Sequence, residues 1–393
     1  MYIRQPRYFK DFKCIGGACT SSCCFGWRID WTKEEIDKVK NAPGCSEELK
    51  ALCENTFKQN GEKYKVDLAE NGGCPFLTED FFCRIQRELG EEYLSHTCTI
   101  YPRHYVAFTP VTYRYCNMSC PEVMKKLLSD DKSTDLVNVQ LNKVFTVKNI
   151  LVLNTPNRIK EHPERKHGEE IFEFFYETIS NKKLPLESCI ILGALAAQSL
   201  TKLVGAGEYD RIPEAIKTLR AQMHNGTQLK SIENIKPNYN VKLGVVDKLV
   251  REFFPAILLD SLIDGDGIAN IDLYRRGEFF LEKQFEDRMF AWRNLALNLM
   301  LELITPFQPE ENTIFENYSV FVIAYAFLRH SALAVVEADD RTGSNTDLEK
   351  IILRFSTAIS RSLCHSPKNL KKLTQRLKDF KITSPAYLAR VVK

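Results

Sequence analysis

The sequence has little net charge and no long apolar run. Its 54 Lys and Arg residues nearly balance 51 Asp and Glu, which leaves a formal net charge of +3 at pH 7. So small an excess gives no sign of a nucleic-acid or anionic-membrane partner. The longest uncharged apolar stretch, Tyr318 to Leu328, is shorter than the roughly 18 residues of a membrane helix. The opening residues MYIRQPRYFKDFKC lack the apolar core of a secretory signal. We therefore expect a cytoplasmic protein with no nucleic-acid or membrane partner.

Several familiar metal-binding spacings are also missing. No CxxC pair of the zinc-ribbon or RING type occurs. The CxxxCxxC triplet of radical enzymes that use S-adenosylmethionine would need a cysteine at position 26, which is Gly26. The plant-type ferredoxin pattern C-x4-C-x2-C is missed by one residue at Cys14, Cys19 and Cys23. Spacing alone therefore indicates a site for a soft metal without naming the metal.

Cysteine is what the sequence does have, and it is unevenly placed. Of 13 cysteines, 11 lie between Cys14 and Cys120, and residues 121–393 hold only Cys189 and Cys364. Cytosolic thiols are kept reduced, so metal or cluster ligation explains this clustering better than disulfides do. Cys189 and Cys364 each stand alone in an apolar helical pattern, which predicts buried, unreactive thiols. The same interpretation holds for Cys45 and Cys53. The candidate ligands are Cys14, Cys19, Cys23, Cys24, Cys74, Cys83, Cys98 and Cys120.

Three separated blocks in the first third of the chain carry a more specific signal. They are YFKDFKCIGGACTSSCCFGWRIDW from Tyr8 to Trp31, CPFLTEDFFCRIQRELGEEYLSHTCTIYPRHY from Cys74 to Tyr105, and NMSCPEVMKKLL from Asn117 to Leu128. In this order the blocks resemble the flagellin lysine-N-methylase family. The rest of the chain resembles that family in length and helical character.

The resemblance implies an activity and a cofactor. The activity is transfer of a methyl group from S-adenosylmethionine to the ε-amino group of surface lysines on flagellin. The cofactor is an iron–sulfur cluster of the [4Fe–4S] type, held by the matching cysteines, which are the eight candidate ligands named above. Cys116 stands where the family pattern has an apolar residue and is left out. Eight thiols exceed the four that one cubane cluster needs, so the others are structural or serve a second metal.

One basic residue follows the late cysteines directly. Arg103 ends the segment TIYPR after Cys98, and its guanidinium would suit the carboxylate of the methionine part of the methyl donor. A surface ion pair is the alternative for Arg103. Nearby tyrosines could form a wall that attracts the positive sulfonium, or could simply pack the cysteine-rich module. These tyrosines are Tyr93, Tyr101, Tyr105, Tyr113 and Tyr115.

The patterning predicts a mainly α protein with two parts. Residues 1–130 are expected to form a small cysteine-rich α+β metal-binding module, residues 131–165 a connecting region, and residues 166–393 an all-α bundle of seven to nine helices. A doubly wound sheet, which most S-adenosylmethionine methyltransferases use, requires alternating strand and helix patterns. The sequence does not show that alternation.

Local signals predict individual elements. Thr32 and Glu35 have capping-box spacing, which predicts a helix over 33–40. Thr78 is a candidate cap for a helix over 78–89. Residues 104–115, broken at Thr109-Pro110, predict a β-hairpin, and Pro121 is typical of a helix start. Apolar residues from Leu281 to Leu303 predict one helix that Pro306 closes.

The sequence thus supports the hypothesis of a cluster-dependent protein-lysine N-methylase that acts on flagellin. Two other classes remain open. The first is a non-catalytic scaffold stabilised by zinc, because closed thiolate sites are typical of structural zinc. The second is an iron–sulfur electron-transfer protein that binds no S-adenosylmethionine.

Overall fold

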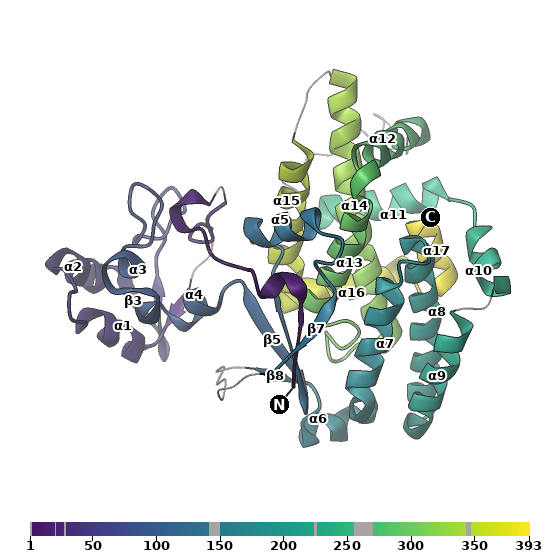
Figure 1. Cartoon of the computed structure of the whole chain (residues 1–393), viewed down its shortest axis with the longest axis horizontal. Coiled ribbons are helices and arrows are strands. Elements are labelled where there is room, and N and C mark those ends of the chain that lie inside the picture. The colour runs from purple at the N-terminus through teal and green to yellow at the C-terminus, as the bar shows by residue number, and fades with distance from the viewer. Residues whose placement is uncertain are drawn as a thin grey trace. The chain divides into compact units, whose positions relative to one another are not determined.

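The chain folds into two compact units in the computed structural model, which describes residues 2–19, 21–26, 29–140, 150–223, 226–254, 270–342 and 347–393. The larger unit contains Met1–Lys10, Tyr105–Ser119 and Met124–Lys393. The smaller unit contains Asp11–His104 and Cys120–Val123 (Figure 1). The smaller unit is therefore an insertion in the chain of the larger one. The protein is mainly helical, with a small α+β region near its N-terminus, as predicted.

A five-stranded mixed sheet belongs to the larger unit. Its order is β7-β1-β6-β5-β8. The N-terminal strand β1 pairs in parallel with β6, where Tyr2 lies opposite Val111, and antiparallel with β7. The neighbouring strands β5 and β6 flank Thr109 and Pro110, which confirms the predicted hairpin. The bounds are β1 Tyr2–Pro6, β5 Arg103–Phe108, β6 Val111–Cys116, β7 Leu136–Val139 and β8 Leu151–Val152.

Helices make up the rest of the larger unit. The long helix α14 packs against α8, α12 and α15, and its side chains from Tyr318 to Leu328 are buried. The helices are α5 Pro121–Ser129, α6 Pro156–Glu161, α7 Gly168–Ser180, α8 Leu186–Gly205, α9 Ile212–Gln222, α10 Gly226–Glu233, α11 Tyr239–Phe253, α12 Ile271–Gln284, α13 Phe290–Glu302, α14 Ile314–Thr342, α15 Leu348–Ile359, α16 Pro367–Asp379 and α17 Pro385–Val392. Short 3₁₀ turns are η1 Arg7–Phe9, η4 Pro163–His167, η5 Tyr209–Arg211 and η6 Glu286–Arg288, and a π-helical turn is η7 Ser360–Cys364.

The helix expected over 281–303 is two helices. The first, α12, ends at Gln284, and α13 begins at Phe290 after the turn η6. Apolar periodicity continues across the break because Phe285, which caps α12, still packs its buried ring on Trp292 at a centroid distance of 5.2 Å. Periodicity reports which residues face the core and not whether the backbone is continuous. Breaks of this kind also raise the count in the described part of 166–393 to eleven α-helices, above the expected seven to nine.

Two helices are long and apolar enough to cross a membrane by length and composition alone. They are Leu186–Gly205 and Ile314–Ala338, and 56% and 83% of their most apolar windows are buried inside the protein. The core helix of a globular unit passes the same test, and packing of α8 against α14 accounts for their apolar character.

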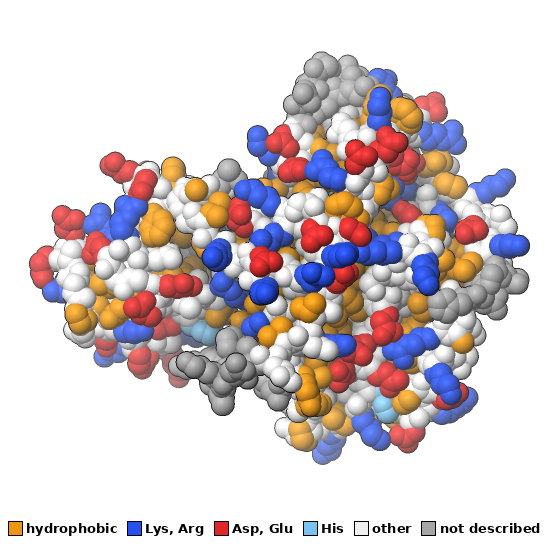
Figure 2. Space-filling model, viewed as in Figure 1, with side chains coloured by type: hydrophobic (Ala, Val, Ile, Leu, Met, Phe, Trp, Pro, Cys, Tyr) orange, Lys and Arg blue, Asp and Glu red, His pale blue; other side chains and the backbone are white. Residues whose placement is uncertain are grey.

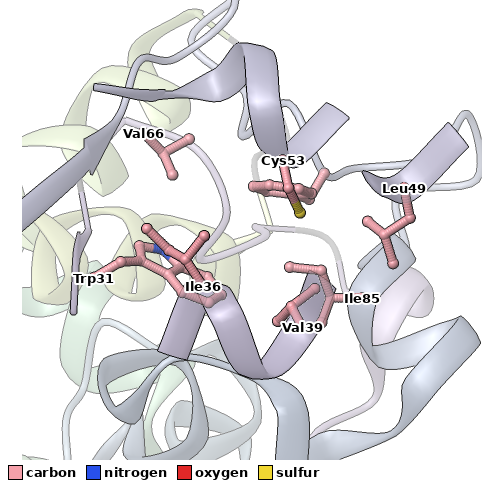
Figure 3. Packing of buried hydrophobic residues seen from close by; sticks show 8 residues of the cluster. Trp31, Ile36, Val39, Leu49, Cys53, Val66 and Ile85 are labelled. Carbon is pink, nitrogen blue, oxygen red and sulfur yellow. The ribbon is translucent and has the colours of Figure 1, made fainter. Parts of the chain in front are cut away.

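The smaller unit combines short helices with a three-stranded sheet of order β2-β4-β3. Its core is a cluster of eight buried residues that includes Trp31, Val39 and Cys53 (Figure 3). The capping box is confirmed, because Thr32 Oγ1 accepts from Glu35 N and the Glu35 carboxylate accepts from Thr32 N. The elements are η2 Gly16–Ala18, β2 Asp30–Trp31, α1 Lys33–Lys40, α2 Glu47–Thr56, β3 Phe57–Asn60, β4 Lys63–Val66, α3 Arg84–Leu89, η3 Glu91–Tyr93 and α4 His96–Ile100.

The prediction that Thr78 caps a helix is wrong. The helix α3 begins at Arg84, and Cys83 is its N-cap. Thr78 closes a loop instead, because its hydroxyl donates to Phe82 O at 2.8 Å. A threonine before an apolar stretch can bond to a turn as readily as to a helix end.

The predicted domain limits 1–130, 131–165 and 166–393 stay a prediction. Within the expected connecting region, residues 141–149 lie outside the described part, whereas β7, β8, α6 and most of η4 occupy described residues.

Candidate metal centre

Four of the eight predicted ligands line one cavity of the smaller unit. These are Cys24, Cys74, Cys83 and Cys98, around a space of about 30 Å³. The remaining wall is apolar and comes from the core of the same unit. The other lining residues are Ile29, Trp31, Val66, Leu68, Phe76, Ile85 and Leu94.

Backbone hydrogen bonds bring these four cysteines together from distant parts of the sequence. Cys74 N donates to Cys24 O at 2.8 Å, which joins the first and second cysteine segments. Cys83 forms a β-bridge with Leu77 and caps α3. Cys98 lies in α4, where its N–H donates to Ser95 Oγ at 3.2 Å. The backbone of each cysteine is thus held by a local turn, bridge or helix end.

Burial sets the acidity of these thiols. It raises the pKa of both Cys74 and Cys98 to about 12, and it also raises the pKa of Cys83. Neighbouring thiols raise the pKa of Cys98 further, because it interacts electrostatically with the other three cavity cysteines. Cys24 differs, because a hydrogen bond with Cys23 lowers the pKa of Cys24 and raises that of Cys23. Thiolates packed so closely repel each other unless a cation lies between them.

The other predicted ligands form a second group in the same unit. Burial raises the pKa of Cys120 to about 11, and the nearby Cys19 and Cys14 thiols raise it further. Cys14 is exposed, and its sulfur accepts from Gly16 N at 3.4 Å. The pKa of Cys23 is raised by Cys14 of the second group and by Cys98 of the cavity, so Cys23 interacts electrostatically with both groups.

The donor chemistry of the cavity fits a thiolate-bound centre. All its candidate ligands are cysteines, which soft metals and iron–sulfur clusters prefer, and its wall is apolar. Among the described residues, no three His, Cys, Asp or Glu side chains are placed so that they could hold a single metal ion. Ligation by the eight cysteines stays a prediction.

The remaining residues named from sequence lie in varied places. Arg103 begins β5, and its guanidinium lies 5.0 Å from the centroid of the Phe12 ring; contact with a methyl donor stays a prediction. Tyr113 and Tyr115 are buried in β6 of the larger unit and pack there. Cys53 belongs to the apolar core of the smaller unit, and Cys45 packs against that core.

A buried polar network in the larger unit was not foreseen. Glu302 accepts from Met118 N at 2.6 Å, from Asn298 Nδ2 at 2.9 Å and from Ser360 Oγ at 2.6 Å. Burial raises the pKa of Glu302 to about 7 despite these donors. The sequence carries a signal for it, because Asn294, Asn298 and Glu302 recur at four-residue steps on a mostly apolar helix.

Comparison with known proteins identifies the class. Residues 173–391, more than half of the chain, match the FliB lysine N-methylase C-terminal domain. The lysine-N-methylases of Salmonella choleraesuis and Salmonella typhimurium are each 24% identical over 381 residues, which is 90% of both chains. The flagellar biosynthetic protein FliU of Salmonella muenchen is 30% identical over 133 residues, 33% of this chain and 78% of that protein. No solved structure matches.

These matches define a protein-lysine methyltransferase, an enzyme whose substrate is another protein. The chain belongs to the FliB lysine N-methylase family, as its cysteine-rich blocks predict.

Proposed function

We propose that the chain is an S-adenosylmethionine-dependent lysine N-methylase that carries an iron–sulfur cluster and acts on surface lysines of flagellin in the cytoplasm. The observation that carries the cluster is the single cavity lined by Cys24, Cys74, Cys83 and Cys98. Family membership supports the methyl transfer, and the flagellar name of one relative supports the substrate.

The number of candidate thiols supports a cluster, because four cysteines line one cavity and a [4Fe–4S] cluster takes four thiolates. A closed zinc site, which gathers four sulfurs around one atom, is the alternative centre for the same cysteines. In a [4Fe–4S] cluster each thiolate binds a different iron, so its ligands stand further apart around a central space. Cys24, Cys74, Cys83 and Cys98 are the cavity residues that would hold such a cluster. When bound, such a cluster would supply iron atoms that can act as Lewis acids or change redox state.

The reaction sets requirements on the protein side. A lysine amine has a pKa of about 10.4, so it carries a proton at neutral pH and must lose it before its nitrogen can accept a methyl group. In net terms an N–C bond forms, the S–CH₃ bond of S-adenosylmethionine breaks, one proton is released, and S-adenosylhomocysteine leaves. An apolar surround would favour the neutral amine by excluding water.

Arg103 is the proposed contact for the methyl donor. The Phe12 ring supports its guanidinium at 5.0 Å, and a guanidinium can bind a carboxylate through two parallel hydrogen bonds. We expect R103A to weaken binding of S-adenosylmethionine about tenfold in titration calorimetry. R103K, which keeps the charge and loses the paired hydrogen bonds, should fall between R103A and the wild type.

The test of the proposal is purification of the full chain without oxygen. We expect brown protein with iron and acid-labile sulfide in equal amounts, and transfer of labelled methyl groups from S-adenosylmethionine to lysines of purified flagellin, located by mass spectrometry. Colourless protein with one zinc per chain would overturn the cluster. Methylation of other proteins but not of flagellin would overturn the substrate assignment, and a redox-active cluster without affinity for S-adenosylmethionine would indicate electron transfer instead.

A further inference from the structure

An aromatic residue of the smaller unit is exposed and conformationally strained. Phe81 has a backbone φ of +58°, in the left-handed region that bulky residues avoid. Its side chain is nevertheless 53% exposed. Both the backbone conformation of Phe81 and the exposure of its ring to water are therefore unfavourable for the folded state. Backbone strain of this kind is typical of functional sites.

The loop that carries Phe81 is held firmly by its own hydrogen bonds. Phe81 N donates to Thr78 O at 2.9 Å, and Thr78 N donates to Phe82 O at 2.9 Å. The Asp80 carboxylate pairs with Arg87 at 2.5 Å, and this pairing lowers the pKa of Asp80 to about 2. The strain is therefore fixed in place, and Phe81 is presented on a preorganised loop.

Two glycines pack closely against this loop. A Cβ atom at Gly17 would lie 2.5 Å from Asp80 O, and one at Gly16 would lie 2.4 Å from the Phe82 ring. Only residues without side chains allow so close an approach. The contact holds Phe82 against the Gly16 backbone, whereas the ring of the adjacent Phe81 is more than half exposed.

The chemistry of this surface suits a cationic side chain with an apolar stem. The Phe81 and Phe25 rings lie with centroids 6.0 Å apart. Next to Phe81 in the chain, the Phe82 ring already makes a cation–π contact, because the Arg87 guanidinium of α3 lies 5.2 Å from its centroid. The exposed carboxylate of Glu79 lies two residues from Phe81. Lysine combines an ammonium group for the carboxylate and ring face with a methylene chain for the apolar surface.

We propose that Phe81, Phe25 and Glu79 form a docking surface for the lysine-bearing segment of the protein substrate. This inference rests on the proposed function and adds to it the place on the smaller unit where the substrate is first held. The three residues bind substrate and take no part in the chemical step.

The experiment compares two exposed phenylalanines in the full chain. F81A should raise the KM for flagellin about tenfold, with kcat changed less than about twofold. F279A is the matched control, because Phe279 is 63% exposed and has Phe280 as a ring neighbour at 5.5 Å, but lies in the regular helix α12 of the larger unit. F279A should leave both constants at the wild-type values. E79Q should raise the KM by about threefold, with a smaller effect at high salt.

A third variant separates docking from structure. Glycine accepts a positive φ, so F81G should have a higher Tm than F81A, while both variants bind flagellin equally weakly. If Phe81 bound no substrate, F81A and F81G would both leave the KM unchanged whatever their Tm, which would overturn the inference.

The remaining outcomes are also distinct. If the wild type methylates flagellin and F81A has the same KM as the wild type, the docking surface is overturned and the proposed function stands. Wild-type protein that is inert toward flagellin overturns the substrate assignment and the docking inference with it. A dimer that F81A converts to monomer, at unchanged KM, would assign the patch to a second copy of the chain.

Discussion

The interiors of the two units contain different kinds of side chain beside their apolar cores. In the larger unit, one buried network joins side chains of the same fold: the Tyr8 hydroxyl donates to Asn298 Oδ1 at 2.6 Å, and Asn298 donates to the Glu302 carboxylate. In the smaller unit, four thiols converge on a cavity beside a core of only eight buried residues. Surface charge does not separate the units, since both signs are interspersed over each in the face shown (Figure 2). The larger unit is packed by its own side chains, whereas the smaller unit, under the proposed function, would be completed by a metal centre.

The largest expected effect separates two kinds of cysteine within the smaller unit. C74A removes a thiol that lines the cavity, so we expect iron per chain to fall and methyl transfer to drop about 100-fold or more. C53A removes a thiol from the apolar core, where Cys53 is 2% exposed. It should cost about 1–2 kcal/mol of unfolding free energy but keep the iron. Iron analysis and a methyl-transfer assay on both variants make the comparison; equal iron loss in both would show that the cavity cysteines have no special role.

The next effect concerns packing in the larger unit. A Cβ atom at Gly193 of α8 would lie 2.0 Å from the hydroxyl oxygen of Tyr318, which is buried and donates to Ile190 O at 3.0 Å. G193A should therefore lower the unfolding free energy by about 3 kcal/mol or more. At Gly244 of α11 a Cβ atom meets nothing within 4 Å, so G244A should raise it by about 0.5–1 kcal/mol. Denaturant unfolding checks both signs, and a neutral G193A would contradict the close contact.

A pH dependence is expected from Glu302. Burial raises its pKa from 4.5 to about 7 in the folded state, so between these values the folded protein binds more protons than the unfolded chain. Its stabilising contribution is complete below pH 4.5 and is lost as pH rises through 7, by roughly 3 kcal/mol. E302Q should lack this component, so the stability advantage of the wild type over E302Q should shrink from pH 5 to pH 8. Urea unfolding at both values tests it; an advantage that grows with pH would refute the sign.

The smallest effect compares helix caps in the two units. T32A removes the capping box of α1 and should cost about 1 kcal/mol. S366A removes the single cap bond from Asn369 N to Ser366 Oγ on α16, at 3.3 Å, and should cost about 0.5 kcal/mol. Because the smaller unit has the smaller core, T32A should lower its thermal transition visibly, while S366A should hardly move that of the larger unit. We expect calorimetry to show one thermal transition for each unit. Equal Tm shifts in T32A and S366A would contradict the expectation that the unit with the smaller core is more sensitive to the loss of a cap.

How far the sequence predicted the structure depended on the range of the interaction. The capping box at Thr32 and the hairpin at Thr109-Pro110 were predictable because their signals lie within a few residues. The backbone hydrogen bond between Cys74 and Cys24 and the loop closed by Thr78 depend on partners that the spacing of residues does not encode. For this reason the sequence could not distinguish the four cavity cysteines from the other four candidate ligands. The strain at Phe81 was equally hidden, because a positive φ at phenylalanine follows from the packing around Gly16 and Gly17 and not from its own preference.

The inserted position of the smaller unit has a consequence for biosynthesis. The strand β1 finds its partners in β6 and β7, where Tyr2 meets Val111 and Ile3 meets Val139, so the sheet cannot close until the ribosome has passed all the residues between. By then Cys24, Cys74, Cys83 and Cys98 have already been synthesised. Under the proposed function, the nascent chain therefore presents all four cavity cysteines for cluster binding before β1 is paired in the sheet.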